Sequence, residues 1–355
     1  MTFSTWKIPA GAVLAAAGLF FCLALMRPPQ ENWRLKKVRI PRGSGYPEIV
    51  RILTESGVLR FPAVFRILVT VTMTGTTLQQ GEYAFPAPPS ALELWQRISS
   101  GDVSKYPVTI PEGSTLYDVA RILADLELAD PGAFVAAATS PGLANRLDIP
   151  GDTAEGFLFP DTYLLVKDMR EEEILSILVR RFHRQFTSDM QSAAAERSLT
   201  LHQVVTIASI IEKETGVEAE KPIVSSVIHR RLKLGMPLQM DPTVIYGLRK
   251  FGGNLSRKDL QVPNPYNTYL NRGLPPGPIA NPGRSALMAA LRPADAPYLY
   301  FVSRNDGSHQ FPKTLEEHNR AVAEFQRERG AKPAKRAAPA GGTGKENGAT
   351  PRPPR

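Results

Sequence analysis

Cysteine and histidine are scarce in this sequence. Its 355 residues include one cysteine, Cys22, and five histidines scattered over the second half of the chain. A single cysteine excludes an intrachain disulfide framework and a site with several thiolate ligands. The sequence also lacks a His-Glu-x-x-His pair, a Gly-x-Gly-x-x-Gly fingerprint after a strand, a Walker-type Gly-Lys-Ser/Thr motif and a Gly-x-Ser-x-Gly elbow. We therefore expect neither a metal nor a cofactor.

Acidic residues are fewer than basic ones, and the excess positive charge is concentrated in one segment. The formal net charge is +9, and the tail at residues 331–355, with six basic residues and one acidic residue, supplies +5 of it. This tail is rich in Pro, Gly and Ala, a composition typical of disorder. The rest of the chain has no basic stripe with interleaved aromatic residues, so nucleic acid is not an expected partner.

An apolar segment without charges lies near the start of the chain. It runs from Ile8 to Met26, which is just long enough for a membrane-spanning helix of about 20 residues. A cleaved signal peptide is the alternative, but no Ala-x-Ala site follows the segment. We therefore predict that residues 1–27 form an uncleaved anchor. Four basic residues follow it closely, against Lys7 before it, and this asymmetry weakly favours a cytoplasmic location for the rest of the chain.

Residues 38–53 and 108–123 form an internal repeat. The two segments read VRIPRGSGYPEIVRIL and VTIPEGSTLYDVARIL, and each predicts a strand, a Pro-x-Gly turn, a Ser cap and an amphipathic helix. Between them we expect a short strand at 81–85 and a capped helix that starts at Ser90 and ends near Gly101. Strand–helix units with this turn resemble LysM-type glycan-binding modules. Residues 28–130 are interpreted as one or two small β/α modules that either bind glycan or act as a spacer.

The chain from residue 131 to residue 330 is predicted to be mainly helical. Apolar residues recur at helical spacing in 131–138, 171–197, 223–234, 243–248, 285–291 and 316–329. A β-hairpin is expected where a strand at 298–303 meets residues 309–311 across an Asn-Asp-Gly turn. The irregular region 236–283 has the length of a functional loop. The predicted fold class is α+β, with an anchor helix, LysM-like modules and a mainly helical domain that has long ordered loops.

Within this domain, residues 200–216 predict a buried helix. Thr200 and Gln203 have the spacing of a capping box. The residues from Val204 to Ile211 are almost continuously apolar, as in a helix that is buried on most of its surface. Gly216 is a natural C′ residue and is expected to stop the helix.

The last turn of this helix carries two carboxylates, Glu212 and Glu214. Burial and a helix C-terminus both disfavour a carboxylate anion, so they raise its pKa. A general acid that works near neutral pH needs a pKa raised in this way. The alternative is that both side chains reach solvent or pair with Lys213 and Arg230.

Carboxylate, amide and hydroxyl groups gather with aromatic residues in three further segments. These are EGFLFPDTY at 155–163, LQMDPTVIY at 238–246 and NPYNTY at 264–269. Such side chains bind sugars through ring stacking and hydrogen bonds to hydroxyl groups. Cleavage of a glycosidic bond requires a carboxylic acid that protonates the leaving oxygen. The pattern favours a glycan as the substrate.

These motifs resemble those of the YceG-like endolytic murein transglycosylases (MltG). The resemblance rests on ASIIEKET at 208–215, LQMDPTVIY, PYNTY, GLPPG at 273–277, EGFLFPDTY and the strand at 298–302. It is dense over residues 155–320 and looser before them. It implies a membrane anchor at 1–27, a LysM-like region at 28–130 and a catalytic domain at 131–330 that faces the cell wall. The tail at 331–355 has no counterpart.

The resemblance implies cleavage of the MurNAc–GlcNAc β-1,4 bond without water. One Glu first protonates the glycosidic oxygen and then takes the proton of the MurNAc C6 hydroxyl, which closes a 1,6-anhydro ring. We expect Glu214 to be this residue, because lytic transglycosylases commonly have Glu followed by Ser at this helix end, and Thr215 follows here. Glu212 lies about 200° around the helix from Glu214, so the two cannot share one role.

The other candidates are assigned by their motifs. The expected substrate-binding residues are Gln239, Asp241, Thr243, Tyr246, Tyr266, Asn267 and Tyr269, and the expected supporting residues are Glu212, Glu155 and Asp161. The expected partners are peptidoglycan glycan strands, the plasma membrane and cell-wall synthesis proteins. A murein substrate requires residues 28–355 on the periplasmic side of the membrane, against the weak charge signal.

Two alternatives from other classes stay open. A hydrolytic muramidase would need a second carboxylate, such as Asp241, to activate water. A glycan-binding membrane protein without catalysis would only position the synthesis machinery. Product mass separates hydrolysis from lytic cleavage, because an anhydro end is lighter than a reducing end by one water. Substitution of Glu214 by Gln separates an enzyme from a binding protein.

Overall fold

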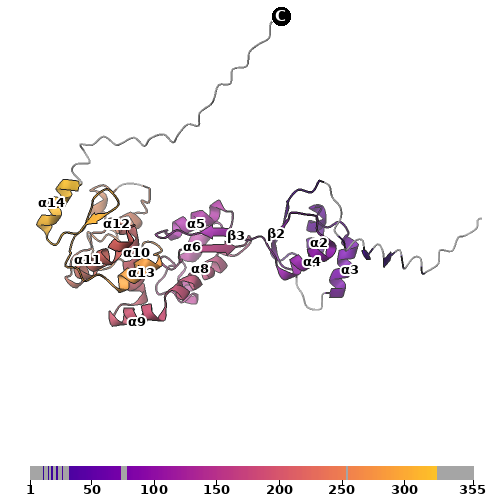
Figure 1. The fold of residues 1–355 in the computed structure, drawn as a ribbon, viewed down its shortest axis with the longest axis horizontal. Helices are drawn as coiled ribbons and strands as arrows, with labels where there is room; N and C mark the ends of the chain where they lie inside the picture. Colours follow the sequence, from indigo (N-terminus) through magenta and orange to yellow (C-terminus); the bar gives the residue numbers. More distant parts are fainter. Residues whose placement is uncertain are drawn as a thin grey trace, which may run out of the picture. The chain divides into compact units, whose positions relative to one another are not determined.

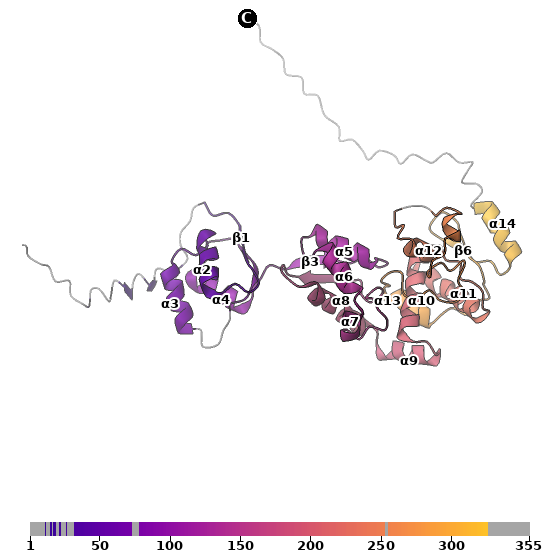
Figure 2. The ribbon, with the colours of Figure 1, turned by 180° about the vertical axis from the view of Figure 1, so that it is seen from behind.

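The computed structural model describes residues 32–72, 78–252 and 255–325, together with isolated positions between Gly11 and Met26. Most of the elements are helices, and short strands lie between groups of them (Figures 1 and 2). The strands of the described residues pair antiparallel in three two-stranded sheets. The predicted α+β class, mainly helical with small sheets, is therefore confirmed.

The element bounds are as follows. The strands are β1 (Lys36–Ile40), β2 (Gly81–Phe85), β3 (Tyr106–Thr109), β4 (Thr162–Leu165), β5 (Val302–Ser303) and β6 (His309–Gln310). The helices are α2 (Tyr46–Glu55), α3 (Pro62–Thr72), α4 (Ala91–Ser100), α5 (Leu116–Asp125), α6 (Pro131–Ala138), α7 (Pro141–Arg146), α8 (Glu171–Gln185), α9 (Ser188–Glu196), α10 (Leu201–Glu214), α11 (Lys221–Lys233), α12 (Asp241–Gly247), α13 (Arg284–Leu291) and α14 (Leu315–Phe325). The described residues also form two 3₁₀ helices, η1 (Glu218–Glu220) and η2 (Asp259–Gln261).

The apolar N-terminal segment and the basic tail lie almost wholly outside the described residues. The anchor at residues 1–27 and the disorder of residues 331–355 therefore stay predictions. Within the part of the chain that the structure describes, no helix is long and apolar enough to cross a membrane. The chain divides into two compact units, Met1–Ala296 and Pro297–Arg355, which are considered separately.

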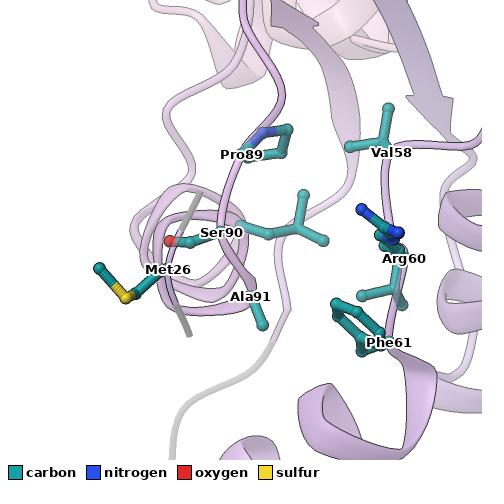
Figure 3. Close-up of a pocket in the computed structure, with 9 residues that line it drawn as sticks. Met26, Val58, Arg60, Phe61, Pro89, Ser90 and Ala91 are labelled. Carbon is teal, nitrogen blue, oxygen red and sulfur yellow. The ribbon is translucent and has the colours of Figure 1, made fainter. Parts of the chain in front are cut away.

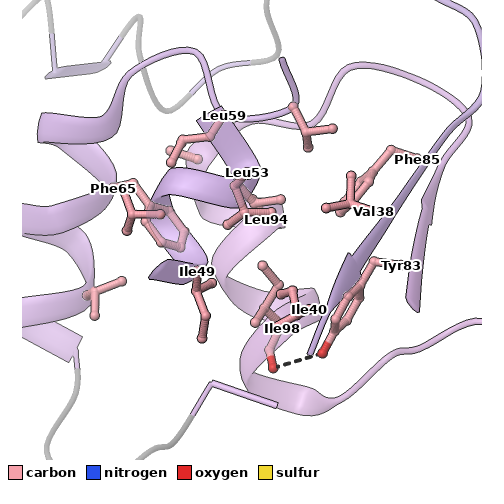
Figure 4. Close-up of a cluster of buried hydrophobic side chains, with 14 of the residues drawn as sticks. Val38, Ile40, Ile49, Leu53, Leu59, Phe65, Tyr83, Phe85, Leu94 and Ile98 are labelled. Atoms are coloured by element: carbon pink, nitrogen blue, oxygen red, sulfur yellow. Dashed lines mark hydrogen bonds between the residues drawn. The ribbon is translucent and has the colours of Figure 1, made fainter. Parts of the chain in front are cut away.

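The first repeat copy begins a small module with its own core. β1 pairs with β2 so that Val38 lies opposite Tyr83. Leu53 of α2 and Leu94 and Ile98 of α4 pack with these strands in one buried cluster (Figure 4). The Tyr83 hydroxyl donates a hydrogen bond to the carbonyl of Ile98 at 3.4 Å. This module is closed by its own apolar side chains and so can fold around them.

The helix predicted after Ser90 is confirmed as α4. Ser90 and Glu93 form a reciprocal capping box, and Gly101 ends the helix with a left-handed backbone (φ 70°). A small cavity of about 10 Å³ lies beside Ser90, between Met26 and Phe61 (Figure 3). It has room for about one water molecule, and the predicted site residues do not line it.

The second repeat copy forms a module whose last strand comes from the predicted catalytic region. β3 pairs antiparallel with β4, and Val108 lies opposite Tyr163. The order β3, α5, α6, α7, β4, α8 resembles the order β1, α2, α3, β2, α4 of the first module. The structural repeat is thus longer than the sequence repeat, and the second module crosses the expected boundary at residue 130.

The Ser caps predicted for the two repeat helices are wrong by one residue. The N-cap residues are Gly45 for α2 and Thr115 for α5, and Thr115 accepts a hydrogen bond from the Asp118 amide. Ser114 instead donates its hydroxyl to the carbonyl of Pro111 at 2.7 Å. The serine closes the turn before the helix, so the cap falls on the next residue.

The single helix predicted over residues 171–197 is two helices, α8 and α9. Phe186 leaves the helical conformation (φ −82°, ψ 82°), and extended Thr187 is the N-cap of α9. The apolar pattern continues across this break, so periodicity alone misses it. The signal that marks it is Thr187 itself, since Thr is a favoured N-cap residue.

Helix α10 lies at the centre of the remaining helices of the first unit. It packs against α9, α11, α12 and α13, and Figures 1 and 2 show α11 and α13 beside it. The side chains from Val204 to Ile211 are all buried. An apolar helix in this position holds the residues of its last turn on a rigid base.

The described residues of the second unit, 297–325, form a hairpin and a helix. β5 and β6 pair with Val302 opposite Gln310, across the predicted turn. β5 spans only two residues rather than the predicted 298–303. Tyr298 instead contacts Phe311 with its ring, at a centroid distance of 5.8 Å. α14 begins at Leu315, close to the predicted start at 316.

Candidate active site

α10 begins as its sequence predicts and ends differently. Thr200 and Gln203 form a reciprocal capping box at the start. The helix ends at Glu214 because Thr215 is extended (φ −140°, ψ 134°). Gly216 does not adopt a left-handed backbone, so the predicted glycine stop is wrong. The Thr215 hydroxyl donates to the buried carboxylate of Glu220 at 3.0 Å, which supports the extended turn.

Glu212 points into a buried ion-pair cluster. One carboxylate oxygen accepts from Lys221 Nζ at 3.0 Å, and the other accepts from the Gly283 amide at 2.9 Å. The side chains of Glu212 and Lys221 are only 7% and 2% exposed. Lys221 also donates to Glu218 and to Ser285, each at 2.7 Å. Glu212 is therefore a fully paired carboxylate that joins α10 to α11 and to the start of α13.

The charge of Lys221 is maintained by its partners. Burial lowers the pKa of Lys221, but hydrogen bonds from its ammonium to Glu218 and Glu212 outweigh burial, and the pKa is raised. Lys213, which sequence analysis offered as a partner of the carboxylates, donates instead to the Gly113 carbonyl at 3.1 Å. Lys221 lies nine residues from Glu212, outside the range of helix-face pairing, so local spacing could not identify it.

Glu214 faces a different environment from Glu212. Its Oε1 atom is enclosed and has no hydrogen-bond partner among the described residues. Burial raises the pKa of Glu214 to about 8; the charge of Asp241 acts in the same direction, and that of Arg231 opposes it. The residue as a whole is only half-buried, so part of its surface reaches solvent. A carboxyl group with such a pKa is mostly protonated at neutral pH, as a general acid must be.

Asp241 and Tyr269 form a hydrogen-bonded pair close to Glu214. The Tyr269 hydroxyl donates to Asp241 Oδ1 at 2.5 Å. Burial raises the pKa of Tyr269, and the hydrogen bond to Asp241 and the charges of Asp241 and Glu214 raise it further. Asp241 is exposed and is the first residue of α12, whose N-cap is Met240. The helix thus begins two residues before the predicted start at 243.

The segment before α12 is fixed to the loop that carries Tyr269. The amide of Gln239 donates to the Thr268 carbonyl at 3.1 Å, and the amide of Met240 donates to the Thr268 hydroxyl at 3.0 Å. Gln239 has a left-handed backbone (φ 53°), and its side chain is exposed. A strained non-glycine residue that is held by its surroundings is typical of functional sites.

Two of the expected substrate-binding residues lie in the protein interior. Thr243 and Asn267 are each 0% exposed. The Thr243 hydroxyl lies 2.9 Å from that of Thr268. Asn267 donates its amide to the carbonyls of Leu260 and Val262, both at 3.0 Å. Their polar groups are hydrogen-bonded within the protein, and both residues support the α12 region from its buried side.

Glu155 connects three elements near the other end of α12. Its carboxylate accepts from the Leu116 amide at the start of α5, from Asn281 and from the Tyr246 hydroxyl, at 3.0 to 3.2 Å. It is 1% exposed. Burial raises the pKa of Glu155 to about 8, although the hydrogen bonds from Leu116 and Tyr246 lower it. The Tyr246 ring in turn contacts the ring of Tyr266, with centroids 5.0 Å apart.

Asp161 lies immediately before β4. Its carboxylate accepts from Arg181 at 2.6 Å and from the Thr162 amide at 2.8 Å. These contacts join β4 to α8. The roles of Lys221, Arg231 and Asn281 were not predicted from the sequence, because they depend on contacts between distant segments. The one signal that marks Asn281 is its position just after the GLPPG motif.

A model of the YceG-like family matches residues 38–324, which include both repeat modules and every candidate site residue. The chain belongs to the YceG-like family. The crystal structure of a YceG-like protein from Listeria monocytogenes is similar, with a TM-score of 0.57 and 30% sequence identity over 82% of this chain and 100% of that one.

Two relatives of this YceG-like protein carry the name endolytic murein transglycosylase. One, from Bacillus subtilis (strain 168), is 31% identical over 319 residues that cover 85% of this chain and 88% of the relative. The other, from Streptococcus pneumoniae serotype 2 (strain D39 / NCTC 7466), is 29% identical over 349 residues that cover 88% of this chain. The match spans only 63% of the length of the pneumococcal relative.

Proposed function

We propose that this YceG-like protein is an endolytic transglycosylase of peptidoglycan, with Glu214 as its acid and base. The observation that carries the proposal is the carboxyl group of Glu214, whose Oε1 atom is enclosed without a hydrogen-bond partner among the described residues and whose pKa is raised to about 8. Relatives of the same family that this chain covers by 88% and 63% are named endolytic murein transglycosylases, and their names supply the substrate class.

The reaction needs one carboxyl group in two successive states. Protonated Glu214 donates its proton to the glycosidic oxygen, and the bond from that oxygen to C1 of MurNAc breaks. The Glu214 carboxylate then takes the proton of the MurNAc C6 hydroxyl, and the C6 oxygen bonds to C1. The leaving strand keeps the first proton and Glu214 recovers the second, so no water is consumed. A raised pKa serves both steps, because it keeps the acid protonated and makes its anion a stronger base.

Asp241 and Tyr269 are proposed to stabilise the positive charge that develops at C1. The ionised side chain of Asp241 raises the pKa of Glu214 and would also stabilise an oxocarbenium-like transition state. Tyr269 fixes Asp241 through the 2.5 Å hydrogen bond. Exposed Gln239, next to this pair, is proposed to contact the substrate. Thr243 and Asn267 are proposed to position these residues rather than to touch the glycan, because both are buried.

The remaining proposals concern location and partners. A murein substrate requires the folded residues to lie outside the plasma membrane, with residues 1–27 as an anchor. The glycan strands of peptidoglycan are then the first partner, and cell-wall synthesis proteins are the expected second one. Termination of strand elongation is the role that an endolytic activity would have at the site of synthesis.

Digestion of purified glycan strands, with mass analysis of the products, tests the proposed reaction. We expect 1,6-anhydroMurNAc ends and fragments from within the strand. Reducing ends heavier by one water would instead identify a hydrolytic muramidase, in which Asp241 beside Glu214 would activate water. Binding of strands without any cleavage would identify a protein that only positions other enzymes.

A further inference from the structure

A cluster of aromatic rings lies at the opposite end of α12 from Asp241. The rings of Tyr117 and Phe251 have centroids 5.7 Å apart, those of Tyr246 and Phe251 are 6.1 Å apart, and those of Tyr246 and Tyr266 are 5.0 Å apart. Tyr117 comes from α5, Tyr246 and Phe251 come from α12 and the turn after it, and Tyr266 comes from the loop of Tyr269. Three separate segments thus contribute to one cluster, which we call the aromatic platform.

The aromatic platform is partly open to solvent. Phe251 is 44% exposed, and the three tyrosines are half-buried. Exposed aromatic side chains that gather in one place mark a binding surface more often than isolated ones do. Arg249 has a left-handed backbone (φ 51°), and its guanidinium lies 5.0 Å from the centre of the Tyr117 ring. A strained residue beside exposed rings again indicates a functional surface.

Contacts with buried groups fix the platform on the side that faces the protein interior. The hydroxyl of Tyr246 donates to Glu155 at 3.0 Å. Gly247 allows the loop to approach α12, since a Cβ atom there would lie 2.4 Å from Asn264 Oδ1 and 2.9 Å from the Cβ atom of Tyr266. Rings fixed in this way lose little conformational entropy when a ligand stacks on them. The platform is therefore preorganised for binding.

The platform also lies along the same elements as the acid. α12 connects Asp241 to Tyr246, which are separated by about 7.5 Å along the helix axis at 1.5 Å per residue. The loop that supplies Tyr269 to the acid site also supplies Tyr266 to the platform. A polymer that places one bond at Glu214 extends in both directions from it. The sugars beyond the cleaved bond therefore need a surface, and the platform shares α12 and this loop with the acid site.

We propose that Tyr117, Phe251 and Tyr266 form a stacking subsite for a sugar of the glycan strand that lies beyond the cleaved bond. The inference rests on the proposed function and adds a binding site to it. The occupant is a sugar ring, whose apolar face packs on an aromatic ring while tyrosine hydroxyls and Arg249 contact its polar groups. Such a subsite would favour substrates long enough to occupy it, as cleavage within a strand requires.

Substitution of Phe251 tests the subsite with the full chain and purified glycan strands. Phe251→Ala should raise KM for long strands about 3- to 10-fold, the range expected for loss of one aromatic contact, and should change kcat little. Phe251→Trp should keep the wild-type KM, and Phe251→Leu should resemble the Ala variant because it is apolar but not aromatic. Leu234→Ala is the control, since Leu234 is 60% exposed and lies outside the platform.

A second comparison uses the shortest oligosaccharide that the enzyme cleaves. The KM for this substrate should be the same for wild type and Phe251→Ala, because it does not reach the subsite. An unchanged KM of Phe251→Ala for long strands would overturn the proposal, as would a Leu variant that behaves like wild type. Tyr117→Leu should raise the KM for long strands as Phe251→Ala does, because it removes another ring of the platform.

Binding separates failure of the subsite from failure of the proposed function. If wild type cleaves no strands, the proposed function fails, but sedimentation of Glu214→Gln with insoluble glycan still measures the subsite. Addition of Phe251→Ala to Glu214→Gln should then reduce the bound fraction, and addition of Leu234→Ala should not. If both substitutions reduced the bound fraction equally, general surface hydrophobicity would explain the binding, and the proposal would be overturned.

Discussion

Glu212 and Glu214 are two residues apart on α10, and their carboxylates lie in opposite surroundings. Glu212 pairs with Lys221 and accepts the Gly283 amide, whereas Oε1 of Glu214 is enclosed without a partner among the described residues. An angle of about 200° around the helix axis separates the two side chains. One turn of one helix therefore carries both a residue that stabilises the fold, Glu212, and a candidate acid, Glu214.

The first prediction compares the two carboxylates directly. Glu214→Gln should lower the release of anhydro-muropeptides by roughly 10²- to 10⁴-fold, because an amide cannot donate and then recover a proton. Glu212→Gln should keep most of the turnover and instead lower the thermal stability, since it weakens a buried ion pair. Product release is measured for each variant at a temperature where both are folded. Full activity of Glu214→Gln with loss in Glu212→Gln would assign the acid to Glu212.

The second prediction concerns the alkaline limit of activity. The acid works only while protonated, so kcat/KM should fall as the pH rises through the pKa of Glu214, about 8. The charge of Asp241 raises that pKa, and Asp241→Asn should therefore move the alkaline limb to lower pH. Tyr269→Phe is the matched control, because it removes the hydrogen bond and keeps the charge. The assignment fails if Asp241→Asn lowers the rate without moving the limb.

The third prediction concerns stability. Most substitutions in a protein core lower the free energy of unfolding, whereas Glu214→Gln should raise it at alkaline pH. Burial raises the pKa of Glu214 from 4.5 to about 8, so the folded state binds more protons than the unfolded state between these values. Wild type should lose stability as the pH rises from about 4.5 to 8, on the order of a few kcal/mol from this group. Glu214→Gln has no carboxyl group to titrate at this position, so it should not show this loss of stability.

Denaturant unfolding at several pH values measures that difference. Glu214→Gln and wild type should have similar stability at pH 4, and the variant should be the more stable one at pH 8. Glu155, whose pKa burial also raises to about 8, is present in both proteins and cancels in the comparison. A constant difference across this range would mean that Glu214 titrates normally in the folded protein.

Local sequence signals predicted part of this structure. The capping box at Thr200 was predicted from the spacing of Thr200 and Gln203, and a capped helix was predicted to start at Ser90; both predictions were correct because the groups that form each cap lie within one helical turn. The apolar run of α10 predicted a buried helix for the same reason. Local signals failed where two of them competed. Gly216 offered a stop, but Thr215 already leaves the helix, supported by its bond to Glu220.

Contacts between distant segments were beyond sequence reasoning. The motifs of residues 155–163, 238–246 and 264–269 were identified as candidate site segments, and the structure brings them together around α12. It does not follow from the motifs that Thr243 and Asn267 are buried. The bond of Glu155 to Leu116, across 39 residues, likewise depends on the tertiary fold. Sequence indicates which residues gather, and packing decides which of them remain exposed.

The fourth prediction concerns the side of the membrane. A reporter enzyme that is active only in the cytoplasm, fused after Gly330, should be inactive, because a murein substrate requires the folded residues outside the plasma membrane. The basic residues that follow the apolar segment favour the opposite orientation, but that bias is statistical. A fusion of the same reporter before Lys7 should be active. An active reporter after Gly330 would exclude peptidoglycan as the substrate.

The last prediction concerns the place where the catalytic part of the chain begins. A fragment of residues 104–330 should cleave glycan strands, whereas one of residues 131–330 should not fold. The shorter fragment removes β3, the partner of β4, and the Leu116 amide that Glu155 accepts. It also removes Ser114, whose carbonyl accepts both the main-chain and side-chain amides of Asn281 at 2.8 Å.

These losses leave buried polar groups without partners, and each such group costs about 1–3 kcal/mol. A domain has only about 5–15 kcal/mol of stability to lose. Residues 32–103 have a separate core, so they should fold alone, and their sedimentation with purified sacculi decides between a glycan-binding module and a spacer. Cleavage by the 131–330 fragment at the rate of the longer one would show that the second repeat copy is dispensable. In that case the catalytic domain would begin where the sequence first indicated.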